Sequence, residues 1–82
     1  MNEERILSNR IRVLRAEKQM TQKELAEKIG VSRQTIISIE KGNYTPSLTL
    51  GFEIANVFDL RVDEVFQYKK TEEDCTEPQK LD

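Results

Sequence analysis

The sequence predicts an all-α fold of five short helices. Apolar residues recur at helical spacing along most of the chain, and Ser, Thr, Gly and Pro stand where helices would begin or end. No segment is seen to alternate apolar and polar residues in the manner of a half-buried strand. The expected connections are short, so neighbouring helices would cross at steep angles.

The first expected helix runs to about Glu17. Its apolar positions are Leu7, Ile11 and Leu14, which share one face at helical spacing, and Ser8 is its candidate N-cap. This spacing predicts a helix that begins close to the start of the folded part of the chain.

The second and third expected helices are separated by a very short turn. Thr21 and Glu24 form a capping-box pattern, in which the hydroxyl accepts from the Glu24 amide and the carboxylate reaches back to the cap. Gly30 suits the left-handed residue that ends such a helix. Ser32 is a good N-cap for the third helix, which ends near Gly42.

Two further helices complete the expected fold. Pro46, in the segment Thr45-Pro-Ser47, suits the first turn of a fourth helix that ends near Phe58. A short fifth helix is expected over about Val62–Phe66.

Charge is unevenly distributed along the 82 residues. The net charge is −2, yet residues 1–45 hold nine Lys or Arg against six acidic residues, whereas residues 71–82 hold five acidic residues and Lys80. A mildly basic domain is therefore expected at residues 5–68, followed by an acidic disordered tail at residues 69–82. The tail either solubilises the protein or competes with nucleic-acid phosphates for the basic part.

Composition argues against several classes of protein. The chain has no histidine and a single cysteine, Cys75, and it shows no Gly-rich phosphate loop, so no enzyme activity, metal or cofactor is expected. No apolar run approaches the ~18 residues of a membrane span. The acidic start Met1–Glu4 is unlike a signal peptide, and we expect a cytoplasmic protein.

The helix–turn–helix at residues 22–41 carries a resemblance to a known family. The strings Met20-Thr-Gln-Lys-Glu-Leu-Ala26, Ser32-Arg-Gln-Thr-Ile36 and Ile39-Glu-Lys-Gly42 resemble the Cro/C1-type helix-turn-helix transcriptional regulators of phage and bacteria. The resemblance covers about residues 9–66. It implies a five-helix, repressor-like DNA-binding domain that reads the major groove with the third helix.

Residues on the outward face of the third helix are the candidate base contacts. Arg33 matches the O6/N7 edge of guanine, Gln34 matches the N6/N7 edge of adenine, and Ile37 is either a contact to a thymine methyl or an incidental exposed apolar residue. The full candidate set is Ser32, Arg33, Gln34, Ile37 and Ser38. The candidate phosphate contacts are Arg10, Gln22, Lys23, Lys41 and Asn43.

The resemblance also implies a structural ion pair and a dimer. Arg15 and Glu40 match a pair that ties the first helix to the third. Apolar residues exceed what the fourth and fifth helices can bury, which predicts a homodimer on a palindromic operator, without a small-molecule substrate. The candidate interface residues are Leu50, Phe52, Val57, Leu60, Val62 and Phe66.

The leading interpretation is therefore a sequence-specific double-stranded DNA-binding regulator, expected to be a repressor. The alternative is a protein-interaction module on the same fold, such as an antitoxin or antirepressor. In that case residues 48–58 and the tail would bind a protein partner, and Arg33 and Gln34 would tolerate alanine.

Overall fold

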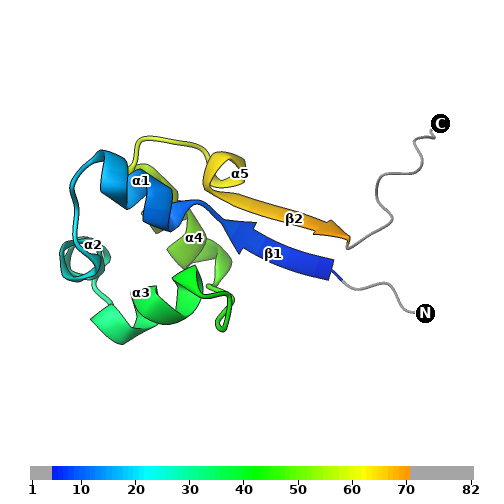
Figure 1. The fold of residues 1–82 in the computed structure, drawn as a ribbon, viewed down its shortest axis with the longest axis horizontal. Coiled ribbons are helices and arrows are strands. Elements are labelled where there is room, and N and C mark those ends of the chain that lie inside the picture. Colours follow the sequence, from blue (N-terminus) through cyan, green and yellow to red (C-terminus); the bar gives the residue numbers. More distant parts are fainter. Residues whose placement is uncertain (1–4, 71–82) are drawn as a thin grey trace.

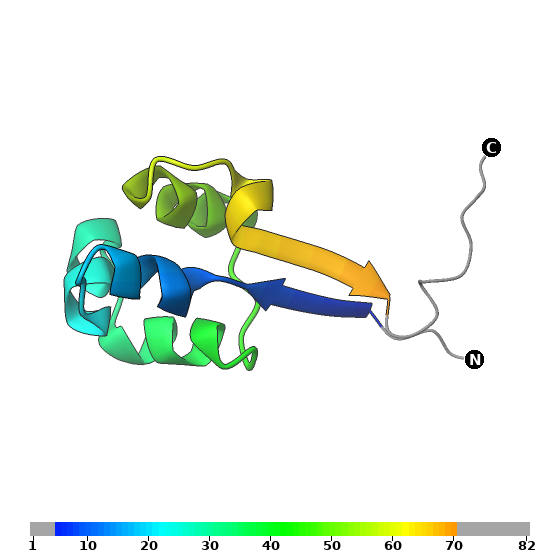
Figure 2. The same ribbon diagram turned by 45° about the horizontal axis from the view of Figure 1, so that its top comes forward.

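Five helices and one two-stranded antiparallel sheet make up residues 5–70, the part of the chain that the computed structural model describes (Figure 1). The helices gather into one body, and the sheet projects from it (Figure 2). None of these five helices is long and apolar enough to cross a membrane. In chain order the elements are β1 (Arg5–Asn9), α1 (Ile11–Glu17), α2 (Gln22–Ile29), α3 (Arg33–Glu40), α4 (Leu48–Val57), α5 (Val62–Val65) and β2 (Phe66–Lys70).

The sheet shows that the all-α expectation is wrong. β1 pairs with β2 in a register that runs from Arg5 opposite Lys70 to Asn9 opposite Phe66, so the sheet joins the two ends of the domain. Phe66 and Tyr68 alternate with polar residues, which is the period of a strand. Pairing also satisfies backbone groups that neither short segment could satisfy alone.

The sheet shifts the ends of two expected helices. Leu7 and Ser8 lie in β1, and α1 begins only at Ile11, so Ser8 is not its N-cap. Phe66 begins β2 instead of closing α5. β2 also extends to Lys70, past the expected domain end at residue 68, so Lys69 and Lys70 of the expected tail at residues 69–82 belong to the sheet. The rest of that expected tail, residues 71–82, lies outside the described residues.

The caps of the helix–turn–helix form as their residue types predict. Thr21 Oγ1 accepts from the Glu24 amide at 3.0 Å, and Glu24 Oε1 accepts from the Thr21 amide at 2.8 Å. Gly30 ends α2 with φ +76°. Ser32 Oγ accepts from the Thr35 amide at 3.2 Å and caps α3.

The fourth helix starts slightly later than expected. Ser47 caps α4 by accepting from the Leu50 amide at 3.1 Å, so Pro46 precedes the cap and does not lie in the first helical turn.

A single apolar core holds the helices together. Full burial of each large apolar side chain contributes roughly 1.5–3 kcal/mol, so the core fixes how α2 and α3 cross. Phe66 belongs to it and lies against Gly51 of α4. The buried residues are Ile11, Leu14, Leu25, Ala26, Ile36, Ile39, Ile54, Ala55, Phe58, Val65 and Phe66.

Candidate nucleic-acid interface

α3 presents its polar residues outward because its apolar residues anchor it. Ile36 and Ile39 are buried on the core face, while Arg33 and Gln34 in the first turn are exposed. Ile37 is half-buried, and its two interpretations, a contact to a thymine methyl or an incidental exposed apolar residue, both stay predictions. The helix therefore offers a polar N-terminal end and a partly covered apolar side chain to a ligand.

A basic hollow lies between α1, the start of α2 and α3. Its volume is about 510 Å³. Five of its nine lining residues are Lys or Arg and only Glu40 is acidic, which makes this concave surface attractive to a polyanion. The residues that line it are Arg12, Arg15, Thr21, Gln22, Lys23, Arg33, Ile37, Glu40 and Lys41.

Glu40 is the centre of a hydrogen-bond network below this hollow. Arg15 Nε lies 2.6 Å from Glu40 Oε2, and the Arg15 and Glu40 side chains are 14% and 7% exposed. Gln22 Nε2 donates to Glu40 Oε1 at 3.1 Å. The network joins α1, α2 and α3 and neutralises the one carboxylate in the hollow, so the remaining charge there is positive.

The other candidate base contacts lie on the outer face of α3. Gln34 Nε2 donates to Ser38 Oγ at 3.4 Å, which aligns these two side chains along one helix face. Ser32 Oγ is engaged in the helix cap and also lies 3.0 Å from Thr35 Oγ1. Arg33 and Ile37 are thus the candidate base contacts that also line the hollow.

Three of the five candidate phosphate contacts line the hollow, and Arg10 and Asn43 do not. Gln22, Lys23 and Lys41 line the hollow, whereas Arg10 Nη1 donates to the Glu64 carbonyl at 3.3 Å beside α5. Arg12, which the sequence analysis did not single out, lines the hollow instead. Arg12 precedes Arg15 by three residues, and residues three apart on a helix share a face. This spacing could have predicted that Arg12 lies beside Arg15 in the hollow.

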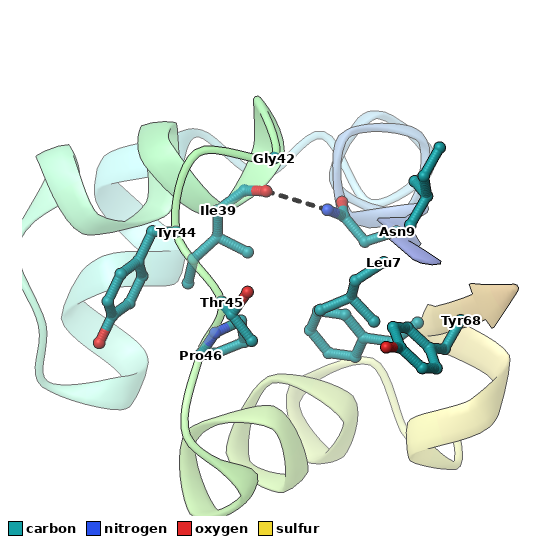
Figure 3. Close-up of a pocket in the computed structure, with 10 residues that line it drawn as sticks. Leu7, Asn9, Ile39, Gly42, Tyr44, Thr45, Pro46 and Tyr68 are labelled. Carbon is teal, nitrogen blue, oxygen red and sulfur yellow. Dashed lines mark hydrogen bonds between the residues drawn. The ribbon is translucent and has the colours of Figure 1, made fainter. Parts of the chain in front are cut away.

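The sheet supports the turn that follows α3. Asn9 Nδ2 donates to the Ile39 carbonyl at 3.0 Å, and Asn9 Oδ1 accepts from the Ile11 amide at 3.1 Å. Figure 3 shows the bond from Asn9 to the Ile39 carbonyl at one end of a cleft of about 710 Å³. Leu7 and Tyr68 of the sheet lie opposite Pro46 of the turn across the cleft, which Tyr44 also lines.

Asn43 is held in that turn by the backbone. Its amide donates to the Ser38 carbonyl at 2.9 Å, and Gly42 before it has φ +82°. The Asn43 side chain is exposed next to the end of α3, which is where its expected phosphate contact requires it.

The expected dimer residues differ widely in exposure. Phe52 is 51% exposed, and its neighbour Leu48, one turn earlier on α4, is 72% exposed. Phe66 is only 8% exposed because its ring fills the core, so it offers little surface to a partner. The remaining four pack partly against the core: Leu50, Val57, Leu60 and Val62.

Comparison with known proteins identifies similar chains. A family model described as helix-turn-helix matches residues 11–65. An uncharacterized helix-turn-helix-type transcriptional regulator of Methanocaldococcus jannaschii is 48% identical over 66 residues, which cover 80% of this chain and all of that protein. A cryptic phage CTXphi transcriptional repressor of Vibrio cholerae is 32% identical over 66 residues, covering 80% of this chain and 60% of that protein.

A solved structure shows the same fold. The crystal structure of a candidate DNA-binding protein from Bacteroides fragilis is similar with a TM-score of 0.69 and 32% sequence identity, and the match covers 76% of this chain and all of that one.

Proposed function

Because the chain belongs to the helix-turn-helix family of transcriptional regulators, which bind DNA, we propose that it is a repressor that reads a palindromic operator with α3. The observation that carries this proposal is the basic hollow beside the exposed first turn of α3. Similarity to the Vibrio cholerae phage repressor supports repression rather than activation. A repressor of this kind acts by occupying its operator, which needs DNA binding alone.

The first turn of α3 supplies the base-specific contacts. Arg33 is exposed and donates from two nitrogens, which matches guanine O6 and N7, and Gln34 matches adenine N6 and N7. Each such bidentate contact discriminates by about 1–3 kcal/mol against a wrong base. Ile37, on the wall of the hollow, meets a thymine methyl beside the guanine.

The rim of the hollow supplies the phosphate contacts. Lys23 stands at the start of α2, where free backbone N–H groups add partial positive charge. Gln22 Nε2 donates one proton to Glu40, and its second proton can donate to a phosphate oxygen. Arg12 and Lys41 flank these two residues, and Asn43 extends the contact along the backbone past α3.

A second copy of the chain completes the operator-binding unit. Phe52 borders a shallow hollow of about 490 Å³ with Leu60 and Val62, and Leu48 extends this apolar surface along α4. A two-fold dimer through this surface would place two α3 helices about 34–36 Å apart, one turn of DNA. Each would then read one half of a palindrome.

Selection from a random duplex pool tests the proposal. Wild type is compared with the double variant Arg33→Ala/Gln34→Ala at physiological salt. We expect wild type to enrich a short palindrome and the double variant to lose that preference while retaining its fold. Failure of the folded wild type to enrich any sequence would overturn the proposal in favour of a protein-binding module.

A further inference from the structure

The two edges of the sheet differ in their side chains. β2 carries Lys69 and Lys70, and lysine on an edge strand opposes pairing with another chain. β1 carries neither lysine nor proline, and its Ile6 is 50% exposed. An edge without such protection is a template for a further strand, and a two-stranded sheet gains stability from a third. We infer that the free edge of β1 binds an extended, uncharged segment of a partner protein as a third strand.

The register identifies the backbone groups at this edge. The Arg10 amide donates to the last carbonyl of α5 at 2.9 Å, and hydrogen-bonded pairs alternate along an antiparallel ladder. The backbone groups of Ser8 therefore point to β2, whereas those of Leu7 and Asn9 point away from it. Within residues 5–70, the amides and carbonyls of Leu7 and Asn9 have no other backbone partner. A strand beside β1 would form hydrogen bonds with these groups.

The cleft of Figure 3 lies next to this edge. In Figures 1 and 2, the segment between α3 and α4 lies on the β1 side of the sheet, and Figure 3 shows it as the opposite wall of the cleft. Thr45 precedes Pro46, which favours an extended backbone. Residues 44–46 form no backbone hydrogen bond with the described part of the chain. Both walls of the cleft therefore offer backbone groups to an inserted strand.

The lining of the cleft selects uncharged side chains. None of its ten lining residues is charged, although 34% of the chain is Asp, Glu, Lys or Arg. A charged side chain placed there would lose hydration without an ion-pair partner. Successive side chains of a strand point to opposite faces, so alternate residues of the added strand would lie beside Leu7 and its cross-strand neighbour Tyr68. The expected partner segment thus carries apolar residues two positions apart and no charge between them.

Selection from a pool of short random peptides tests the inference on the full chain. Wild type should enrich segments that carry apolar residues at alternate positions and no charge. Ile6→Lys places a charge on the wall of the cleft and should abolish this enrichment. Val13→Lys is the control, because Val13 is 52% exposed but lies on α1 outside the cleft, and it should retain the enrichment. No enrichment by wild type, or equal enrichment by Ile6→Lys, would overturn the inference.

The enriched peptide then shows whether backbone hydrogen bonds hold it. In spectra of the full 15N-labelled chain, it should shift the amides of Leu7 and Asn9, while the amide of Ser8, which faces β2, moves less. N-methylation of the peptide amides that face β1 removes their donors and should weaken binding about tenfold, whereas methylation of the other alternate set should have a smaller effect.

Three results of these spectra would overturn the inference. The first is equal affinity of all forms of the peptide, and the second is a set of shifts confined to α4. The third is a shift of the Leu7 and Asn9 amides with protein concentration alone, because the edge would then belong to a second copy of the chain. None of these measurements uses DNA, so their outcome is independent of the proposed function.

Discussion

The guanidinium of Arg15 donates two hydrogen bonds to the carboxylate of Glu40, from Nε at 2.6 Å and from Nη2 at 3.1 Å. Both side chains are mostly buried, so loss of one partner leaves the other charge out of water. We expect Arg15→Met or Glu40→Gln to lower the free energy of unfolding by about 3–5 kcal/mol, measured by denaturant titration.

A double variant that exchanges the two charges distinguishes the contribution of the ion pair from that of the neighbouring groups. The double variant Arg15→Glu/Glu40→Arg restores an ion pair, so it should lose less stability than either reversal alone. Rescue will be partial, because the Met20 carbonyl, which accepts from Arg15 Nη1 at 2.9 Å, would then face a carboxylate. Simple additivity of the two single losses would contradict a direct coupling.

Asn9 provides a second prediction, on the link between the sheet and α3. Asn9→Ala removes a bond to the Ile39 carbonyl and a bond from the Ile11 amide. The expected loss in unfolding free energy is about 1–3 kcal/mol. Ser8→Ala is the control, because Ser8 is an exposed neighbour in β1 with no side-chain hydrogen bond within residues 5–70. Equal losses in the two variants would mean that the Asn9 bonds contribute nothing specific.

Arg12 and Arg10 form a matched pair for DNA binding. Arg12→Ala should weaken binding to all sequences alike and reduce the slope of log affinity against log salt by about one unit. Arg10→Ala should leave that slope unchanged, because Arg10 bonds the Glu64 carbonyl away from the hollow. The measurement is a salt titration of affinity. The reverse result would place the DNA backbone along the Arg10 side of α1, as the sequence analysis expected.

Local signals were sufficient to predict the helix–turn–helix. The capping box of Thr21 and Glu24, the left-handed Gly30 and the Ser32 cap each act within a few residues, so their roles can be read from residue type and spacing. The five helices are confirmed for the same reason. The Arg15–Glu40 pair lies 25 residues apart, and family resemblance, not spacing, led to it.

Long-range pairing explains what sequence reasoning missed. β1 and β2 stand at opposite ends of the domain, and neither is a strand without the other. Phe66 was expected in the dimer interface, but it lies in the core. Its place there depends on the approach of β2 to Gly51 of α4, which local sequence does not show. The phosphate contact of Arg10 stays a prediction, and its bond to the Glu64 carbonyl is a long-range contact that the spacing of residues 10–17 does not show.

Phe52 and Val13 test the dimer with matched exposure. Their side chains are 51% and 52% exposed, but only Phe52 lies on the apolar surface of α4. Phe52→Lys should convert a dimer into a monomer in sedimentation experiments over a range of concentrations, since a buried lysine in the interface would be unpaired. Val13→Lys should leave the dimer intact. A wild-type protein that stays monomeric at high concentration would refute the dimer itself.

Two glycines should respond to alanine with opposite signs. Gly51 lies inside α4, and an added Cβ would stand 3.8 Å from Phe66 Cε2, an ordinary van der Waals distance. Gly51→Ala should therefore stabilise the domain by about 0.5–1 kcal/mol, because glycine is unfavourable in a helix interior. Gly30 has open space around it but a φ of +76°, so Gly30→Ala should cost about 1–2 kcal/mol in backbone strain.

Thermal melts measure the effects of both substitutions, because a change of about 1 kcal/mol in the free energy of unfolding shifts the Tm of a domain this size by roughly 4–8 °C. We expect the Tm to rise for Gly51→Ala and to fall for Gly30→Ala. If Gly51→Ala lowered the Tm, α4 and β2 would approach more closely than the 3.8 Å distance implies, and the packing of Phe66 would leave no room for a methyl group. If Gly30→Ala were neutral, the turn between α2 and α3 would not depend on a left-handed residue.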